Sequence, residues 1–178
     1  MKNILLGVSG SIAAYKAADI ANDLTKAGHN VDVILTAGGA RFITAFTLQT
    51  LSGNPVHTDM FDTMAPDPVQ HIALARRADL LLVAPGSADI IAKLANGIAD
   101  DMLSTVVLAL GAIPKLIAPA MNTVMYENPL VQGNIAKLGS AGFGFIEPRV
   151  GHLAEGGVGR GALADVDVIV ATALAALG

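Results

Sequence analysis

The chain has 178 residues, of which 53% are hydrophobic and only 15% are charged, and its formal net charge is −4. This length suits a single domain. The lack of cysteine excludes disulfides, thiolate metal sites and thiol catalysis. The lack of a basic cluster argues against nucleic acid, and no apolar run reaches the ~18 residues of a membrane span. Soluble domains usually have about 25% charged residues, so we expect this less charged chain to bury part of its surface between the subunits of a homo-oligomer. We also expect it to be cytoplasmic.

The first half of the chain alternates apolar runs with segments of helical spacing. Its order is predicted to be strand 3–8, helix 12–27, strand 31–35, helix 46–51, strand 55–57, helix 71–77, strand 80–84 and helix 88–95. A further helix is predicted to run through Phe42 and Ile43. Residues 58–70 have no periodic order, which predicts a mobile loop.

The second half repeats the alternation. It is predicted to contain helix 102–110, strand 115–118, a helix after Asn122, helix 129–138, strand 143–146, a glycine-rich loop at 151–161 and a closing helix 166–177. Strands that alternate with helices predict an α/β fold with a doubly wound, mostly parallel sheet of the Rossmann-like, flavodoxin type. Residues 1–178 would then form one three-layer domain.

Small polar residues follow the first predicted strand as Ser9-Gly10-Ser11. Backbone N–H groups at the start of a helix form an anion site suited to phosphate. The dinucleotide and Walker A patterns are both absent, so a mononucleotide phosphate fits better. A tight turn capped by Ser9 or Ser11 is an equally good interpretation of these residues alone.

Similar turns follow two later strands. Ser87 and Asp89 come after the central strand, where they can cap a helix or hydrogen-bond a cofactor. Asn122 follows another buried strand and is either an N-cap or a ligand-binding residue. Since ligands bind at the carboxyl ends of parallel strands, these turns together favour a site.

Two further segments have weaker signals. His71 begins a predicted helix, and a lone histidine is more often structural; no pair of histidines has zinc-helix spacing, so no metal is expected. The loop 151–161 has a composition that can close over a ligand, and the segment 148–161 is interpreted as a substrate flap. Within it Arg160 can meet a phosphate or carboxylate, and Glu155 can donate a proton.

These motifs together resemble the flavin-containing cysteine decarboxylases, especially the phosphopantothenoylcysteine decarboxylases of coenzyme A biosynthesis. The resemblance covers nearly the whole chain, in order. It rests on the segments Gly7 to Lys16, His71-Ile72, Ala84 to Asp89, Lys93 to Asp101, Pro119-Ala120-Met121-Asn122 and Leu153 to Gly156. It implies FMN-dependent decarboxylation of 4'-phosphopantothenoylcysteine to 4'-phosphopantetheine, with FMN at a subunit interface of a homotrimer that can assemble further into a dodecamer.

The resemblance also implies roles for particular residues. The cofactor-binding residues would be Ser9, Gly10, Ser11, Thr36, Phe42, Ser87, Ala88, Asp89 and Ala120. The substrate-binding residues would be Met121, Asn122, Ala154 and Arg160, and the catalytic residues His71, Asn122 and Glu155. The flavin supplies the difficult chemistry, and the protein supplies orientation and electrostatics.

The chain departs from the family pattern at Glu155, where the flap normally carries a proton-donating cysteine, and at Ala73, where the family often has glutamate. Two alternatives therefore stay open. The reaction can stop at the enethiol, as in peptidyl-cysteine decarboxylases, or the chain can be a catalytically impaired flavoprotein scaffold. A flavin prenyltransferase is disfavoured, because that subfamily lacks the Pro-x-Met-Asn motif.

Overall fold

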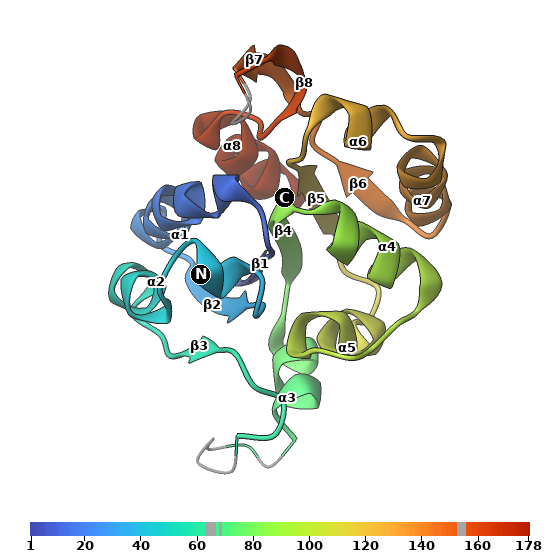
Figure 1. Cartoon of the computed structure of the whole chain (residues 1–178). Helices are drawn as coiled ribbons and strands as arrows, with labels where there is room; N and C mark the ends of the chain where they lie inside the picture. The colour runs from blue at the N-terminus through green and yellow to red at the C-terminus, as the bar shows by residue number, and fades with distance from the viewer. Residues whose placement is uncertain (63–66, 68, 153–155) are drawn as a thin grey trace.

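A parallel sheet of six strands forms the centre of the molecule, here described from a computed structural model (Figure 1). The structure describes residues 1–62, 67, 69–152 and 156–178. In sequence the strands are β1 (Asn3–Val8), β2 (Asn30–Leu35), β3 (Val56–His57), β4 (Leu80–Gly86), β5 (Lys115–Pro119) and β6 (Phe143–Phe145). Their order across the sheet is β3-β2-β1-β4-β5-β6, and every neighbouring pair is parallel, which confirms the predicted fold class.

Helices cover both faces of the sheet because the side chains of each strand alternate between them. Ile4, Leu6 and Val8 of β1 lie in one buried cluster, whereas Leu5 lies in the other. The first cluster packs against the 3-10 helix η1 (Ile12–Lys16), α1 (Ala17–Lys26), α2 (Ala45–Ser52) and α8 (Val166–Ala176). The second packs against α3 (Gln70–Arg77), α4 (Ala88–Asn96), α5 (Met102–Ala109) and α7 (Pro129–Ser140).

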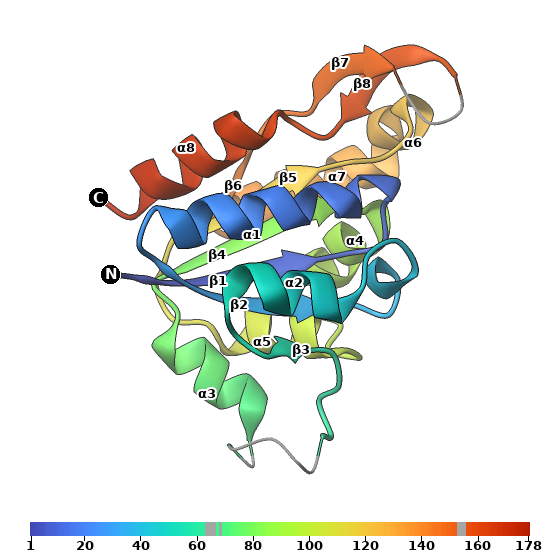
Figure 2. The same ribbon diagram turned by 90° about the vertical axis from the view of Figure 1, so that its left-hand side faces the viewer.

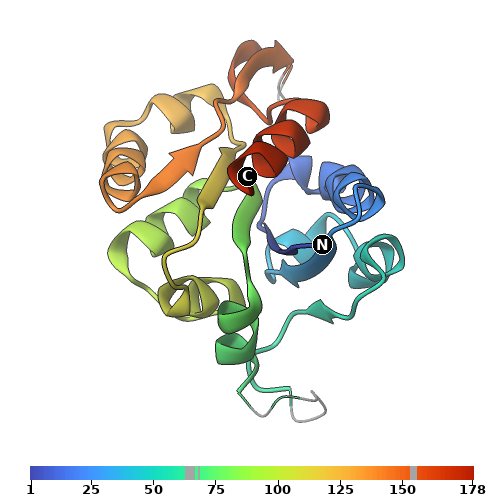
Figure 3. The same cartoon turned by 180° about the vertical axis from the view of Figure 1, so that it is seen from behind.

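A two-stranded antiparallel hairpin, β7 (Arg149–His152) paired with β8 (Val158–Ala162), stands apart from the main sheet. Figure 2 shows it with the short helix α6 (Thr123–Glu127) at the edge where the sheet strands end. Both chain termini lie at the opposite end of the strands (Figure 2), which is the end seen from behind in Figure 3. The hairpin corrects the prediction of a loop at 151–161, because the strands pair across the glycines as well as across the larger residues.

The other differences from the predicted elements are small. The helix predicted through Phe42 and Ile43 is only the 3-10 turn η2 (Gly39–Arg41), and the helix predicted at 12–27 starts as η1 before α1. The middle of the predicted loop 58–70 lies outside the described residues. Among the helices that the structure describes, none is both long and apolar enough to span a membrane.

Candidate functional site

A cavity of about 540 Å³ opens at the edge of the sheet where β1, β4 and β5 end. This volume is typical of a cofactor or small-molecule pocket. Its lining comes from Gly10, Ser11, Ile12, Ala13, Tyr15, Lys16, Phe42, Ser87, Ala88, Asp89, Ala120, Met121, Asn122, Met125, Arg149, Gly161, Ala162 and Leu163. Segments far apart in the sequence therefore meet where the parallel fold predicts a ligand site.

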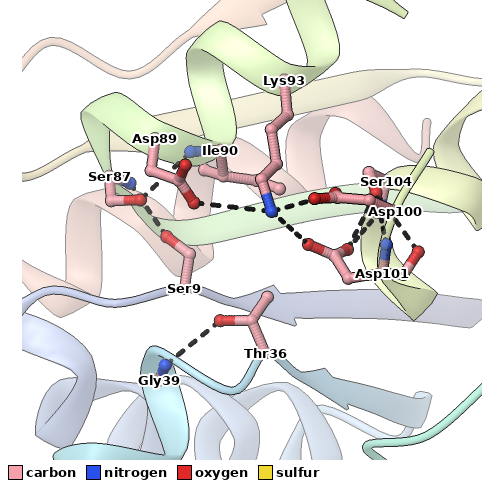
Figure 4. Close-up of polar contacts among 10 residues, drawn as sticks. All are labelled: Ser9, Thr36, Gly39, Ser87, Asp89, Ile90, Lys93, Asp100, Asp101 and Ser104. Atoms are coloured by element: carbon pink, nitrogen blue, oxygen red, sulfur yellow. Dashed lines mark hydrogen bonds and ion pairs between the residues drawn. The ribbon is translucent and has the colours of Figure 1, made fainter. Parts of the chain in front are cut away.

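The turns after β1 and β4 are tied together by one buried serine (Figure 4). Ser9, only 2% exposed, donates from its hydroxyl to the Pro85 carbonyl (2.7 Å) and accepts from the Ser87 N–H (2.9 Å). Ser87 in turn caps α4 by accepting from the Ile90 N–H at 3.2 Å. Ser9 thus fixes the position of the Ser87 backbone at the cavity and does not itself line the cavity.

The turn after β2 packs against the turn after β1 through glycines. A Cβ added to Gly10 would lie 3.1 Å from the Gly38 Cα, and one added to Gly39 would lie 2.6 Å from the Val8 carbonyl oxygen. Thr36 accepts from the Gly39 N–H (3.1 Å) (Figure 4), so its hydroxyl shapes this turn. Gly10 therefore leaves room for close backbone approach on one side and lines the cavity on the other.

A lysine of α4 joins this helix to the start of α5 (Figure 4). The Lys93 ammonium lies 3.0 Å from Asp100, 3.1 Å from Asp101 and 3.8 Å from Asp89. The hydrogen bond to Asp100, followed by that to Asp101, raises the pKa of Lys93 above its ordinary value despite partial desolvation. Asp101 also caps α5 by accepting from the Ser104 N–H (2.8 Å), which completes a capping box.

Asn122 is both an N-cap and a cavity residue. Its side-chain oxygen accepts from the Val124 N–H (2.7 Å) and the Met125 N–H (3.4 Å), which begins α6 directly after the sheet. The preceding Met121 N–H donates to the Gly161 carbonyl (3.0 Å) of β8. The hairpin is therefore joined to the segment that carries Asn122.

The two hairpin arginines have different surroundings. Arg160 of β8 pairs with Glu147, and its guanidinium lies 5.5 Å from the centre of the Tyr126 ring. Burial, followed by the charge of Glu147, raises the pKa of Tyr126, whose hydroxyl donates to Glu147 at 3.4 Å. Arg149 of β7 instead lines the cavity, and its Nε donates to the Leu163 carbonyl at 3.2 Å.

Most of the predicted site residues meet at this cavity. It is lined by Gly10, Ser11, Phe42, Ser87, Ala88, Asp89, Ala120, Met121 and Asn122. Ser9, Thr36, His71 and Arg160 are not among its lining residues, and Ala154 and Glu155 lie outside the described residues. The binding and catalytic roles of all these residues stay predictions.

His71 lies on the first turn of α3, whose neighbouring Gln70 side chain contacts the His57 ring at 3.1 Å. Figure 2 shows α3 under the sheet, on the other side of the molecule from the hairpin and α6. Within one chain, His71 is therefore separated from the cavity that collects Ser11, Ser87 and Asn122.

Sequence reasoning missed several lining residues, among them Ile12, Tyr15, Lys16, Met125 and Arg149. Tyr15 and Lys16 are in the motif that suggested the family, and their place on the first helical turn after β1 was the available signal. Arg149 gave no such signal, because its place depends on the hairpin.

The lining has the chemistry of a flavin mononucleotide site. Apolar side chains such as Ile12, Phe42 and Met125 can cover a planar ring system, while Lys16 and the turn at Gly10-Ser11 can hold a phosphate. In the part of the chain that the structure describes, no three metal-ligating side chains come together. The donor set therefore suits an organic phosphate and offers no metal centre among those residues.

Comparison with known proteins agrees with this geometry. The family model described as Flavoprotein matches residues 1–178. The chain belongs to the flavoprotein family. A probable phosphopantothenoylcysteine decarboxylase from Streptococcus mutans is 53% identical to it over 170 residues, which are 95% of each chain. The coenzyme A biosynthesis bifunctional protein CoaBC of Bacillus subtilis is 50% identical over 169 residues, which are 95% of this chain and 41% of that protein.

Solved structures extend the likeness to the backbone. A PPC decarboxylase mutant complexed with pantothenoylaminoethenethiol superposes with a TM-score of 0.87 at 32% identity, covering 96% of this chain and 95% of that one. The FMN-dependent cysteine decarboxylase SpaF gives a TM-score of 0.85 at 31% identity, covering 99% and 97%. The resemblance drawn from the sequence motifs is thus confirmed at the level of family and fold.

Proposed function

We propose that this chain is an FMN-dependent carboxy-lyase that converts 4'-phosphopantothenoylcysteine to 4'-phosphopantetheine in coenzyme A biosynthesis. The observation that carries the proposal is the cavity in which Ser11, Ser87 and Asn122 meet at the carboxyl edge of the sheet. Its support from known proteins is the 53% identity to a probable phosphopantothenoylcysteine decarboxylase over 95% of both chains. The fold alone would not specify this substrate.

The residues of the cavity would divide the work. Gly10, Ser11 and Lys16 would hold the cofactor phosphate, and Phe42 would cover the ring. Bound FMN supplies reversible acceptance of a hydride from the cysteinyl side chain. Asn122 would donate a hydrogen bond to the substrate carboxylate and so hold the group that leaves as carbon dioxide.

A second copy of the chain would complete the site, as expected for a homotrimer. This is supported by the separation of His71 from the cavity within one chain. It is supported too by large apolar side chains exposed at the cavity rim, where Ile12 and Tyr15 are each 57% exposed and Met125 is 49% exposed. An exposed patch of this kind marks an interaction surface. In the assembly, His71 of one copy would assist thiol activation beside Asn122 of the next.

Glu155 would supply the last proton in place of the cysteine that the family carries. A carboxyl group can do so if burial under the flap raises its pKa toward neutrality. Without that donor the reaction would end at the enethiol. This is the main alternative outcome, and it would follow from the same cavity with the same cofactor.

Mass spectrometry of phosphopantothenoylcysteine after incubation with the FMN-loaded protein tests the proposal. Loss of carbon dioxide alone is expected, and Glu155→Gln should then divert the product to the form that has also lost two hydrogens. The enethiol form from the unaltered protein would instead establish the half-reaction. Unchanged substrate in the presence of bound flavin would contradict the proposed substrate.

A further inference from the structure

The guanidinium groups of the two hairpin arginines contact different parts of the molecule. Arg160 of β8 is engaged by Glu147 and the Tyr126 ring, and it is not among the residues that line the cavity. Arg149 of β7 lies across the hairpin, where its backbone pairs with Ala162, and it lines the cavity together with Gly161 and Leu163. Only Arg149 is therefore placed to meet a cavity ligand in this arrangement.

The Arg149 side chain is held along one edge of its guanidinium. Its Nε lies 3.2 Å from the Leu163 carbonyl oxygen and 3.2 Å from an Asp165 carboxylate oxygen. Its Nη1 lies above Gly151, where an added Cβ would be 2.9 Å away. The structure gives Nη1 and Nη2 no hydrogen-bond acceptor among the described residues. The Nε is thus anchored. The two terminal nitrogens carry four N–H donors, which can donate hydrogen bonds to a ligand.

The charges around the cavity favour an anion at this place. Lys16 and Arg149 are the cations of the described lining, and Asp89 is its one carboxylate. Arg149 also pairs through its Nε with Asp165, whose side chain is 62% exposed. The Asp89 side chain is 76% exposed and lies 3.8 Å from the Lys93 ammonium, so its charge is partly compensated. Lys16 follows the turn after β1, whereas Arg149 comes from the hairpin, so the two cations approach the cavity from different elements.

We propose that Arg149 binds a phosphate monoester in this cavity and makes the site selective for the phosphorylated form of its ligand. A planar guanidinium matches phosphate oxygens with two parallel N–H bonds, which an ammonium group cannot do. The phosphate belongs either to the substrate or to FMN. The naming of those two molecules rests on the proposed function, but the recognition of a phosphate monoester at Arg149 does not.

Paired ligands that differ only by the phosphate group test this assignment by titration calorimetry. The first pair is 4'-phosphopantothenate and pantothenate, added to the FMN-loaded protein. The second pair is FMN and riboflavin, added to the apoprotein. Arg149→Gln should weaken the phosphorylated member of one pair by about 10- to 100-fold, because a hydrogen bond between charged groups is lost, and should leave the other member within about threefold. Arg149→Lys should recover part of the affinity.

Two control variants keep the Arg149 guanidinium in place. Arg76→Gln removes an exposed guanidinium from the last turn of α3, which is not among the cavity-lining residues. Asp165→Asn removes the ion pair at Nε while the Leu163 carbonyl stays in place. Both variants should preserve the preference for phosphate within about threefold. If Arg149→Gln loses affinity only for 4'-phosphopantothenate, Arg149 binds the substrate phosphate. If it loses affinity only for FMN, Arg149 binds the cofactor phosphate.

Three results would overturn the assignment. In the first, Arg149→Gln weakens the binding of both members of each pair equally. In the second, it weakens the binding of neither. In the third, the unaltered protein does not prefer the phosphorylated ligands. Because these are binding measurements, failure of the proposed decarboxylation would be seen separately, as unchanged substrate in the mass spectrum with the phosphate preference intact.

Discussion

Two regions border the cavity, and they are held in place differently. The turns after β1 and β4 are joined by buried hydrogen bonds through Ser9, which is 2% exposed. The hairpin β7–β8 is attached by two partly exposed ion pairs, Arg160–Glu147 and Arg149–Asp165, and by the Met121–Gly161 backbone bond. A surface ion pair is worth at most about 1 kcal/mol, whereas a buried polar group left without its partner costs about 1–3 kcal/mol.

This difference suits two tasks. The turns form a rigid platform, because any movement of Ser9 or Ser87 would leave backbone groups unpaired in the interior. The hairpin can separate from α6 at low cost while the sheet stays intact, since its strands pair with each other and not with the sheet. Under the proposed function, the platform would position the cofactor and the hairpin would control access to the substrate.

The largest effect is expected where the two regions meet, at Asn122. Asn122→Asp keeps an acceptor oxygen for the cap of α6, because Asp and Asn are equally good N-caps. It also sets a carboxylate against the substrate carboxylate. We expect kcat/KM for phosphopantothenoylcysteine to fall by about 100-fold or more, while the melting temperature and FMN affinity change little. Steady-state kinetics, thermal melting and flavin titration measure the three quantities.

Asn128→Asp is the matched control, because Asn128 caps α7 in the same way and is not among the cavity-lining residues. It should leave turnover within about twofold. Retained activity in Asn122→Asp would show that the carboxylate is held elsewhere.

The platform is tested by Ser9→Ala. This change leaves the Ser87 N–H without its buried acceptor and should lower the free energy of unfolding by about 1–3 kcal/mol. For a chain of this size the melting temperature should fall by about 2–4 °C per kcal/mol, and FMN should bind more weakly because Ser87 lines the cavity. Ser140→Ala, on an exposed helix position, is the control and should change stability by less than about 0.5 kcal/mol.

The platform was also the region that the sequence predicted best. Ser9, Ser87 and Asn122 each follow an apolar strand and precede a helix, so local pattern and the parallel topology together place them at one edge. The strand boundaries agree with the prediction to within one or two residues because the apolar runs of a buried parallel sheet are unambiguous.

The hairpin was missed for an equally physical reason. Five of the eleven residues from 151 to 161 are glycine, a composition that has low strand propensity and is typical of loops. Two of these glycines are required by contacts with residues that are distant in the sequence. Gly159 packs on Thr123, and Gly161 packs on the Met121 carbonyl. The positions of Arg149 and Arg160 depend on this pairing, so no local pattern could have distinguished them.

Gly159→Ala tests the attachment of the hairpin. The added Cβ would clash with the Thr123 side chain, so either that side chain or the hairpin must shift. We expect the KM for phosphopantothenoylcysteine to rise about 10-fold, with global stability reduced by less than about 1 kcal/mol because the hairpin can yield locally. Gly157→Ala is the control, because among the described residues its Cβ would meet nothing within 4 Å.

A second substitution distinguishes this contact from a general effect of alanine. The Thr123 hydroxyl is buried without a hydrogen-bond partner among the described residues, so Thr123→Ala should be nearly neutral alone. It removes the atom closest to the new Cβ, and the Gly159→Ala/Thr123→Ala double variant should recover most of the lost KM. A double variant no better than Gly159→Ala would mean that another contact holds the hairpin.

The smallest effect is expected at Asp101, which pairs with Lys93 of α4, the helix that begins at the platform. Burial alone would raise the pKa of Asp101, but hydrogen bonds from Ser104 and Lys93 outweigh it and hold the pKa below its ordinary value of 3.8. A lowered pKa stabilises the fold above the unfolded-state value, and this contribution is lost as the pH falls through the lower folded-state value. Asp101→Asn keeps the cap of α5 but removes the charge that faces Lys93, so at pH 7 it should cost about 1 kcal/mol or less. Melting curves recorded from pH 6 to pH 2.5 should show the variant and the unaltered protein converging below about pH 4; a constant gap between them would mean that the Asp101 carboxylate gives no charge-dependent support to the platform.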